Sequence, residues 1–420
     1  MGIQSAMYSG VSGLNTTSQA MSVIGNNLAN TGTTGFKGSR TLFSDVLSSN
    51  VYGSGGVSQV GRGVGLSTID AVFSQGTFES TTSGTDVAIE GNGFFILKVP
   101  GDNTAYYSRA GSFHFDKDGY LISPEGLRVQ GKGFDLVDNT ALLPNDATDI
   151  RVSSIGLIGA NPTSDLTFNT NLDANSKVID TATYPTIDPT VRQSYTYSAS
   201  SEVFDSLGVA HLLTAYWRMV DDVNNVWEAA YSIDNSTTAT PLPDMQFTST
   251  GQPPTYPDPF TAVTAPIAWG NGAADSTITL NLDCTQYASA SSVIGTAQNG
   301  YGAGELTNVA INNDGVVVAV YSNGRQINIA QLVLAKFQNP GALQQAGANR
   351  FTASSDVGII RVGVPGPELG RLFTNALEQS NVDMGQEFVN MIATQRSFQA
   401  NSKIITTVDD MLNELINLKR

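Results

Sequence analysis

The chain has 420 residues with 21 basic and 37 acidic side chains, so its formal net charge at pH 7 is −16. This balance argues against a nucleic-acid-binding protein, because phosphate contacts require clustered lysine and arginine side chains. The single cysteine, Cys284, excludes both an intrachain disulfide framework and a cysteine-cluster metal site.

The length predicts roughly two to four domains. No segment approaches the ~18 consecutive apolar residues that a membrane-spanning helix needs, so we expect no membrane insertion. The beginning of the chain, "MGIQSAMYSGVSGLN", contains no lysine or arginine and no compact apolar core. We therefore expect no cleaved signal peptide.

An amphipathic helix is predicted for residues 1–30. Methionine and leucine recur every seven residues, with isoleucine on a flanking heptad position, which is typical of a narrow helical seam. The seam residues are Ile3, Met7, Leu14, Met21, Ile24 and Leu28. Gly10, Gly13 and Gly25 are expected to weaken this helix by up to ~1 kcal/mol each, so it should be marginal alone in water.

The stretch "NNLANTGTTGFKGSR", residues 26–40, ends this helix with turn-forming residues. We expect Gly32 and Gly35 to adopt conformations that other residues resist, and Phe36 to be a packing anchor. Asn27 and Asn30 complete this linker motif. Residues 31–74 are interpreted as a linker.

Strand patterns dominate residues 75–147 and 300–363, which we interpret as two parts of one middle β domain. Short alternating or apolar runs occur at 86–99, 106–131 and 315–337. Asn323 and Gly324 lie between two such runs. This dipeptide predicts a hairpin with a type I′ turn, which requires positive φ at both positions.

Residues 148–299 form a separate block that is rich in Thr, Ser, Asp and Pro, as in "PLPDMQFTSTGQPPTYPDPF". Short strand patterns such as "SYTYSASSEVFDSLG" and "HLLTAYWRMV" alternate with turns, which predicts an inserted all-β domain. The expected fold is therefore mainly β, with an α-helix at each terminus.

A second, longer amphipathic helix is predicted within residues 376–420, after a linker at 364–375. Its seam again repeats every seven residues and comprises Met384, Met391, Phe398, Ile405, Val408, Leu412 and Leu415. Ser380 and Asp383 are expected to form a capping box at its start. Such a stripe ordinarily docks on its own domain, but the heptad period shared by both termini favours pairing of the helices with each other or with other copies.

Catalytic motifs are weak in this sequence. His114 and His211 fall in different predicted domains, and no nucleophile elbow, HExxH, P-loop or dinucleotide fingerprint stands in context. The segment "HFDKDGYLISPE" places acidic residues at several calcium-loop positions, but its first position is His114 and its flanks have strand patterns, so we prefer a plain Asp-Gly turn. We expect no catalytic, cofactor-binding or metal site, although scattered carboxylates could still pair in space.

Several parts of the sequence resemble the rod and hook proteins of the bacterial flagellum. "NNLANTGTTGFKGSR" resembles the N-terminal motif of that family, and "NVDMGQEFVNMIATQRSFQANSKIITTVDDMLNELINLKR" resembles its C-terminal helix. "SQGTFESTTSGTDVAIEGNGFFIL" and "SRAGSFHFDKDGYLISPEGLRVQG" are similar to its middle β domain, while the central block matches loosely at "EVFDSLGVAHLLTAYW". Length and the central insertion favour the hook subunits, with the distal rod protein as the alternative.

The resemblance implies a structural subunit and not an enzyme. In this family the terminal helices form an inner tube around an export channel, the β domain a middle layer and the insertion the outer surface. The hook is a flexible universal joint that transmits motor torque to the filament in motility.

The implied partners are other copies of the chain, the rod protein, the hook cap, the hook-filament junction proteins and the flagellar type III export apparatus. Export by that apparatus implies a location in the flagellum, outside the cell, without a cleaved signal peptide. The resemblance implies neither a cofactor nor a nucleic-acid partner.

Two other protein classes remain open. A secreted β-rich binding protein or adhesin would explain the Thr- and Ser-rich centre, and a hydrolase with an unrecognised site would explain the polar turns. Neither class accounts for heptad seams at both termini.

Overall fold

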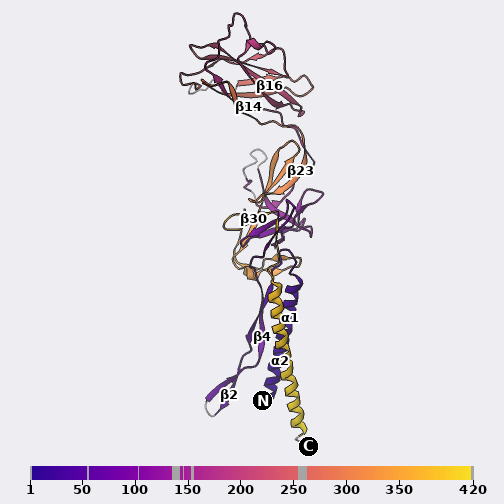
Figure 1. Cartoon of the computed structure of the whole chain (residues 1–420). Coiled ribbons are helices and arrows are strands. Elements are labelled where there is room, and N and C mark those ends of the chain that lie inside the picture. Colours follow the sequence, from indigo (N-terminus) through magenta and orange to yellow (C-terminus); the bar gives the residue numbers. More distant parts are fainter. Residues whose placement is uncertain are drawn as a thin grey trace. The chain divides into compact units, whose positions relative to one another are not determined.

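The computed structural model describes residues 2–53, 56–102, 104–134, 142–144, 146–152, 156–253 and 263–417. The chain divides into two compact units. The first unit comprises Met1–Ser153, Val309–Ala319 and Ile327–Arg420, and the second comprises Ser154–Asn308 and Val320–Gln326. Strands dominate both units and one long helix lies near each terminus (Figure 1), so the predicted mainly β fold with terminal helices is confirmed.

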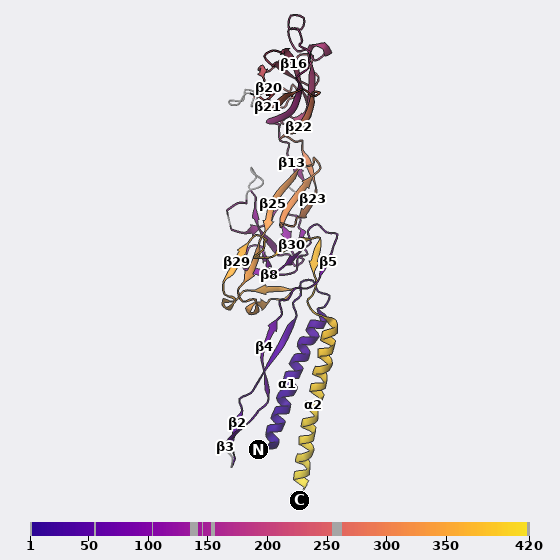
Figure 2. The same ribbon diagram turned by 60° about the vertical axis from the view of Figure 1, so that its left-hand side comes forward.

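The two terminal helices, α1 (Gly2–Ala29) and α2 (Met384–Asn417), lie side by side in the first unit (Figures 1 and 2). They run antiparallel, because Gly10 near the start of α1 faces Ile405 in the second half of α2, whereas Gly38 just after α1 faces Val382 just before α2. Both chain ends therefore lie at the same end of this unit.

A β-ribbon follows α1, within the segment interpreted from the sequence as a linker. Its antiparallel strands are β1 (Ser39–Asp45) with β4 (Val64–Ala71), and β2 (Ser49–Gly53) with β3 (Gly56–Val60). The ribbon lies along α1 (Figure 2), where the backbone N–H of Val64 donates to Oγ of Ser12 at 3.3 Å. Residues 31–74 are thus mostly β structure, and β1 and β4 pack on the helix.

The largest sheet has the strand order β13-β23-β24-β25-β11-β7-β8-β28-β27, with five further strands paired to it. Its members are β7 (Phe94–Lys98), β8 (Ala105–Ser108), β9 (His114–Phe115), β10 (Leu121–Ile122), β11 (Arg128–Gly133), β12 (Thr148–Asp149), β13 (Leu157–Ile158), β23 (Gly304–Ile311), β24 (Val316–Tyr321), β25 (Gln326–Leu332), β26 (Leu334–Phe337), β27 (Gln344–Gln345), β28 (Arg350–Thr352) and β29 (Ile360–Gly363). Two short 3-10 helices, Pro340–Ala342 and Ser355–Val357, accompany the last strands.

Strand β7 shows why the middle of the first unit is stable. Phe95 and Leu97 point into one apolar cluster with Val87 and Leu332, while Phe94 and Ile96 point into another on the opposite face. A continuous apolar run is what a strand buried on both faces requires.

Two small strand pairs bring the chain back to α2. They are β6 (Val87–Glu90) with β30 (Arg371–Thr374), and β5 (Phe78–Ser80) with β31 (Ala376–Glu378). Residues 376–378 are therefore a strand and not the first part of the terminal helix. The predicted capping box is also wrong, because Asp383 is the residue before α2 and its Oδ1 accepts the N–H of Gln386 at 2.8 Å. Ser380 instead accepts from the N–H of Val382.

The second unit contains two sheets around one apolar core. One sheet has the order β20-β21-β14-β22 and the other β15-β16-β17-β18, with β19 also paired to β17. The strands are β14 (Asp165–Asp173), β15 (Tyr197–Phe204), β16 (Ala210–Asp221), β17 (Val226–Ile233), β18 (Thr240–Pro241), β19 (Met245–Gln246), β20 (Val263–Ile267), β21 (Ser276–Tyr287) and β22 (Ser292–Gln298), and a 3-10 helix occupies Arg192–Ser194. Phe168, Trp217 and Trp227 are fully buried in the core that both sheets cover.

The structure contains both turns that the sequence predicts, at residues 116–119 and 323–324. Gly119 has φ +82°, and Oδ1 of Asp116 accepts backbone N–H groups from Asp118 and Tyr120 between the paired strands β9 and β10, so the Asp-Gly turn is confirmed. The hairpin at residues 323–324 is present, but only Gly324 has positive φ, so the predicted type I′ turn is wrong. The side chain of Asn323 is held by donating to the carbonyl of Gly302 at 2.7 Å.

Candidate assembly interface

Small residues make the contact between α1 and α2. A Cβ atom at Gly13 would lie 2.6 Å from Nδ2 of Asn401, and one at Gly10 would lie 3.1 Å from Cγ1 of Ile405. From residue 5 onward, where burial is described, the buried residues of α1 are Gly10, Gly13, Thr16, Ala20, Ile24 and Asn27. Glycine permits such close approach because it carries no side chain. Two of the three glycines predicted to weaken α1 are therefore contact points of the helix pair.

The predicted seam residues lie mostly on the flank of this contact. On α1, Ile24 is buried while Met7, Leu14, Met21 and Leu28 are half-buried. On α2, Val408 is buried, Met391 and Ile405 are half-buried, and Met384, Phe398 and Leu412 are 52%, 43% and 37% exposed. The side chains of Ile3 and Leu415 fall outside the described residues. The role of this set as an interface between copies stays a prediction.

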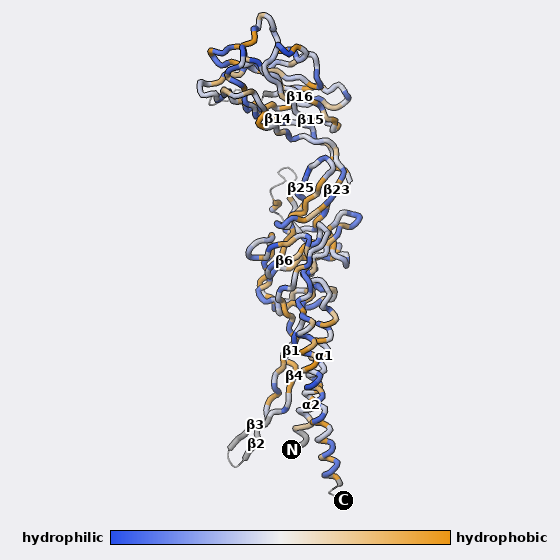
Figure 3. Tube along the Cα trace, viewed as in Figure 1, coloured by the Kyte–Doolittle hydropathy of each residue, from blue (hydrophilic) through white to orange (hydrophobic). Residues whose placement is uncertain are grey.

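Exposed apolar side chains cover much of α2 and part of the ribbon, and apolar residues recur along both helices (Figure 3). On α2 they are Met384, Phe388, Val389, Ile392, Phe398, Ile404, Met411, Leu412 and Ile416, and along residues 39–71 they are Leu42, Phe43, Val46, Leu47 and Ile69. Large apolar surface left open in this way marks interaction sites.

One asparagine of the linker motif joins the end of α1 to the ribbon. Asn27 is buried, its Nδ2 donates to the carbonyl of Ser39 at 2.7 Å, and its Oδ1 accepts the N–H of Ser39 at 2.9 Å. Both hydrogen-bonding groups of the amide are thereby satisfied. The pair of bonds holds the first residue of β1 beside the last turn of the helix.

The other motif residues shape the turn after α1. Asn30 donates to the carbonyl of Asn26 at 2.8 Å, and Phe36 is buried as the sequence predicts for a packing anchor. Gly35 has φ +69°, and a Cβ atom there would lie 2.5 Å from the backbone N of Ala110. Gly32 lacks positive φ and a Cβ atom there would meet nothing within 4 Å. The predicted need for glycine is thus confirmed at Gly35 and wrong at Gly32.

Next to Gly35 lies a cluster of three almost completely buried charges, Lys37, Arg109 and Glu378. Nζ of Lys37 lies 2.7 Å from Oε1 of Glu378, and Nη1 of Arg109 lies 3.4 Å from Oε2. Lys37 also donates to the carbonyl of Ser74, and Arg109 donates to that of Gly91. We call these three residues the anchor cluster.

The anchor cluster has two cations for one carboxylate. Burial lowers the pKa of Lys37, and the hydrogen bond and charge of Glu378 oppose that change. Burial likewise lowers the pKa of Arg109, again opposed by Glu378. Because Lys37 follows α1 and Glu378 precedes α2, the cluster ties the chain at both helix ends to Arg109, which directly follows β8.

A neutral side chain adds a second link at the same place. Oδ1 of Asn381 accepts the N–H of Gly38 at 2.8 Å, and its Nδ2 donates to the carbonyl of Val72 at 2.7 Å. Asn381 thus connects the two ends of the ribbon to the segment just before α2.

Sequence reasoning missed the anchor cluster, although a weak signal exists. Each of the three charges stands alone in its stretch of the sequence. Residues 26–39 contain only Lys37, residues 103–113 only Arg109 and residues 372–382 only Glu378 as a charged residue. Charged side chains are almost never fully buried unless they are paired. A lone charge in a neutral stretch does not reveal its partner, so the pattern could have suggested candidates but not the cluster.

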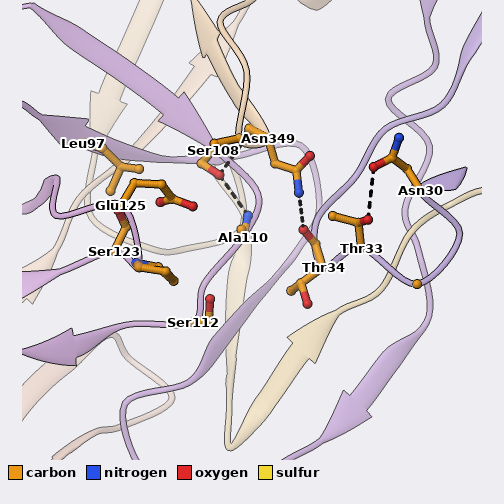
Figure 4. A pocket seen from close by; sticks show the side chains of 13 residues that line it. Asn30, Thr33, Thr34, Leu97, Ser108, Ala110, Ser112, Ser123, Glu125 and Asn349 are labelled. Carbon is orange, nitrogen blue, oxygen red and sulfur yellow. Dashed lines mark hydrogen bonds between the residues drawn. The ribbon is translucent and has the colours of Figure 1, made fainter. Parts of the chain in front are cut away.

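A polar pocket lies beside the turn after α1 (Figure 4). Its lining comprises Asn30, Gly32, Thr33, Thr34, Leu97, Ser108, Ala110, Ser112, Ser123, Pro124, Glu125, Ala348 and Asn349. Nδ2 of Asn349 donates to the carbonyl of Thr34 at 2.8 Å, and Oγ of Ser108 donates to the carbonyl of Asn349 at 2.9 Å. These bonds hold the turn against the large sheet.

The described residues contain no group of three or more His, Cys, Asp or Glu side chains that could hold a metal ion. Among the described helices, none is long and apolar enough to cross a membrane. His114 is exposed on β9 in the first unit, and His211 is buried in the second. The arrangement around α1 and α2 offers contact surface and anchoring contacts.

Comparison with known families accounts for four parts of the chain. Residues 7–37 match the flagella basal body rod protein family, and residues 88–160 match the flagellar hook protein FlgE/F/G D1 domain. Residues 171–301 match the flagellar basal body protein FlaE D2 domain, and residues 374–418 match the flagellar basal body rod FlgEFG protein C-terminal family.

Whole proteins are also similar. The flagellar hook protein FlgE of Borreliella burgdorferi is 36% identical over 99% of this chain and 99% of its own length. That of Escherichia coli is 34% identical over 99% of this chain and 100% of its own length. The crystal structure of Helicobacter pylori flagellar hook protein FlgE2 has the same fold over 72% of this chain and 99% of its own, with a TM-score of 0.52 and 14% identity. With this similarity along its whole length, the chain belongs to the flagellar hook protein family.

Proposed function

We propose that the chain builds the hook as a homopolymer, with α1 and α2 side by side in the inner wall of a tube. The chain is a subunit of the flagellar hook and not the distal rod protein, because the relatives that match its whole length are hook proteins. The central residues 171–301, which the distal rod alternative would lack, match a domain of the same family.

The exposed apolar surface of α2 is the observation that carries the proposal. The helix pair buries small residues between α1 and α2, and leaves Phe388, Ile392 and Phe398 about half-exposed. A soluble monomer gains nothing from such a surface, whereas neighbouring copies would bury it and gain roughly 1.5–3 kcal/mol for each large side chain. Three of the assembly residues predicted from the seams, Met384, Phe398 and Leu412, are exposed on this surface.

The proposed layers follow the sequence divisions. The terminal segments 1–30 and 376–420 form the inner tube, 31–74 and 364–375 connect it, 75–147 and 300–363 form the middle layer, and 148–299 form the outer surface. In the inner segment, the helical part begins at Met384, after strand β31.

The anchor cluster supports a role in transmitting force. Lys37 and Glu378 lie within eight residues of the end of α1 and the start of α2, respectively. Glu378 pairs with both Lys37 and Arg109, and Arg109 directly follows β8. A torque that reaches the middle strands is thereby passed to both helices at one point. This fits a joint that transmits motor torque to the filament.

The proposed partners are further copies of the chain, the rod protein, the hook cap, the hook-filament junction proteins and the type III export apparatus. The proposed location is the hook of the flagellum outside the cell, after export by the type III apparatus. The proposed role is structural and not enzymatic.

Electron microscopy tests this proposal. The purified full-length chain should form tubes with a central channel as concentration and salt are raised. Cells that lack the gene should carry basal bodies with a rod and no hook, and the wild-type gene should restore the hook. The proposal would be refuted if the purified chain stayed monomeric under these conditions and cells that lack the gene still built intact hooks.

A further inference from the structure

The second unit holds a nearly buried histidine between two carboxylates. His211 on β16 is 9% exposed, its Nδ1 lies 2.6 Å from Oδ2 of Asp234, and its Nε2 lies 3.3 Å from Oδ2 of Asp205. Its ring stacks on Trp269, with the ring centroids 4.4 Å apart and the planes inclined by 29°. The proposed assembly of the hook makes no use of this group.

The geometry favours one protonation state of the ring. A neutral imidazole has one N–H donor and one lone pair, so one of its nitrogens would present a lone pair to a carboxylate oxygen. The imidazolium form donates from both nitrogens and satisfies both partners. A charged histidine is therefore the state that this arrangement stabilises.

Each carboxylate also organises the loop on which it lies. Oδ1 of Asp205 accepts backbone N–H groups from Leu207 and Val209 in the turn after β15, and its Oδ2 accepts from Nδ2 of Asn271 at 2.6 Å. Oδ1 of Asp234, in the turn after β17, accepts the N–H of Leu212 at 2.9 Å. Trp269 and Asn271 belong to the loop between β20 and β21, so three connections meet at His211.

We propose that His211 is a proton-operated clamp of the second unit. Its imidazolium holds together the turn after β15, the turn after β17 and the loop between β20 and β21. Loss of the proton removes one of the two charge-assisted hydrogen bonds and leaves two carboxylates with no cation between them, which loosens these three connections.

Each element packed around the His211 ring contributes an identified side chain. The turn after β15 contributes Asp205, the turn after β17 contributes Asp234, the loop between β20 and β21 contributes the uncharged Trp269 and Asn271, and β15 places Val203 opposite His211. Burial lowers the pKa of His211, but the hydrogen bonds and charges of Asp234 and Asp205 outweigh it, so the net shift is upward.

The two aspartates shift in the opposite direction. Burial raises the pKa of Asp205, but hydrogen bonds from Asn271, the N–H of Val209, His211 and the N–H of Leu207 bring it down to about 2. The pKa of Asp234 is also lowered, since its bonds to His211 and to the N–H of Leu212 outweigh burial.

The histidine and the aspartates set opposite limits to the pH range of the clamp. A raised histidine pKa contributes stability that is fully present below the unfolded value of ~6.5 and is lost as pH rises through the folded value. The contribution of the lowered Asp205 is present above the unfolded value of ~3.9 and is lost as pH falls toward 2. The clamp should therefore hold best between about pH 4 and 6.5 and loosen as pH rises through the raised pKa of His211.

The chain offers an internal comparison, because it has only two histidines and His114 is exposed in the first unit. NMR titration of the full-length monomer, assigned with His114→Gln and His211→Gln, should give His211 a midpoint above ~6.5. Tryptophan fluorescence, with Trp269 against the ring, should change over the same pH interval in wild type and in His114→Gln and show no such step in His211→Gln. A His211 midpoint below ~6.5, or an unchanged step in His211→Gln, would overturn the proposal.

A variant that leaves His211 in place tests the proposal even if His211→Gln unfolds. Asp234→Asn removes one carboxylate at a half-exposed position and should lower the His211 midpoint by about one pH unit. Asp222→Asn makes the same charge change at an exposed position of the second unit and should leave the midpoint in place. Equal midpoints in Asp234→Asn and wild type would show that the clamp does not exist.

Discussion

The two units of this chain bury apolar surface in opposite ways. In the second unit, two sheets enclose Phe168, Trp217 and Trp227, which are completely buried. In the helix pair of the first unit, the described part of α2 has one fully buried apolar side chain, Val408, while Phe398 and its neighbours stay exposed. The apolar core between the two sheets of the second unit is complete within one chain. Under the proposed assembly, the exposed apolar side chains of the helix pair are buried only by neighbouring copies.

The buried charged clusters of the two units differ in how far apart their members lie along the chain. In the anchor cluster, Glu378 is 341 residues from Lys37 and 269 residues from Arg109 along the chain. In the second unit, His211 is 6 residues from Asp205 and 23 from Asp234. The first cluster joins the chain ends, and the second joins neighbouring loops, so a change in one unit should leave the other intact.

The largest expected effect comes from Phe398→Asp. In the proposed tube this change loses an aromatic contact worth roughly 2–3 kcal/mol and buries an unpaired carboxylate, so polymer should disappear in sedimentation. Because Phe398 is 43% exposed in the single chain, thermal unfolding of the monomer should barely move.

Gln399→Asp is the matched control, since it adds the same charge at the next exposed position. It should weaken polymerisation less than Phe398→Asp does. A Phe398→Asp monomer that melts several degrees lower would place Phe398 in an intrachain core and contradict the proposed inner tube.

A deletion tests whether the second unit is separable. Asn161 and Tyr301 are joined by two backbone hydrogen bonds of 2.9 Å, so residues 162–300 can be replaced by a short glycine linker across this bridge. The shortened chain should still be exported and polymerise, and electron microscopy should show hooks of altered curvature or stiffness. Failure of the remaining chain to fold, seen by circular dichroism, would show that the two units depend on each other.

Glu378→Gln should destabilise the first unit by about 3–5 kcal/mol, because it leaves Lys37 and Arg109 buried without a counter-charge. Urea unfolding followed by circular dichroism measures this loss. Trp217, Trp227 and Trp269 all lie in the second unit, so the transition seen by tryptophan fluorescence should not move.

Lys37→Met provides the comparison for that variant. Glu378 would keep its contact with Arg109 and the N–H of Gly76, so the loss should be less than half as large. Equal losses for both variants would mean that shape, and not charge balance, governs the anchor cluster.

The smallest effect concerns the glycines of α1. Gly13→Leu should weaken the helix pair by about 1–3 kcal/mol because the new side chain meets Asn401. Gly25→Leu places the same side chain where nothing lies within 4 Å of Cβ, and should stabilise the helix by about 0.5–1 kcal/mol. Protease resistance of the termini should change in opposite directions, and a change in the same direction would argue against the glycine contact.

The sequence by itself located the helices and most of the middle strands. A seven-residue spacing and a run such as Phe94–Leu97 are local patterns. They can therefore be recognised without knowing which element the helix or strand packs against. The turn at residues 116–119 was likewise predictable, since an aspartate can bond the amides of its own turn.

Only the tertiary structure decided which faces and charges meet. The heptad pattern indicated a seam on each helix, but the close approach of α2 occurs at Gly10 and Gly13, and a glycine has no hydrophobic signal. Asn323 lacks the positive φ that its dipeptide suggested, and its amide bonds to Gly302. Nothing in the sequence indicates that Lys37 pairs with Glu378, which lies 341 residues away. The pairing of buried charges depends on where the fold brings them and not on local spacing.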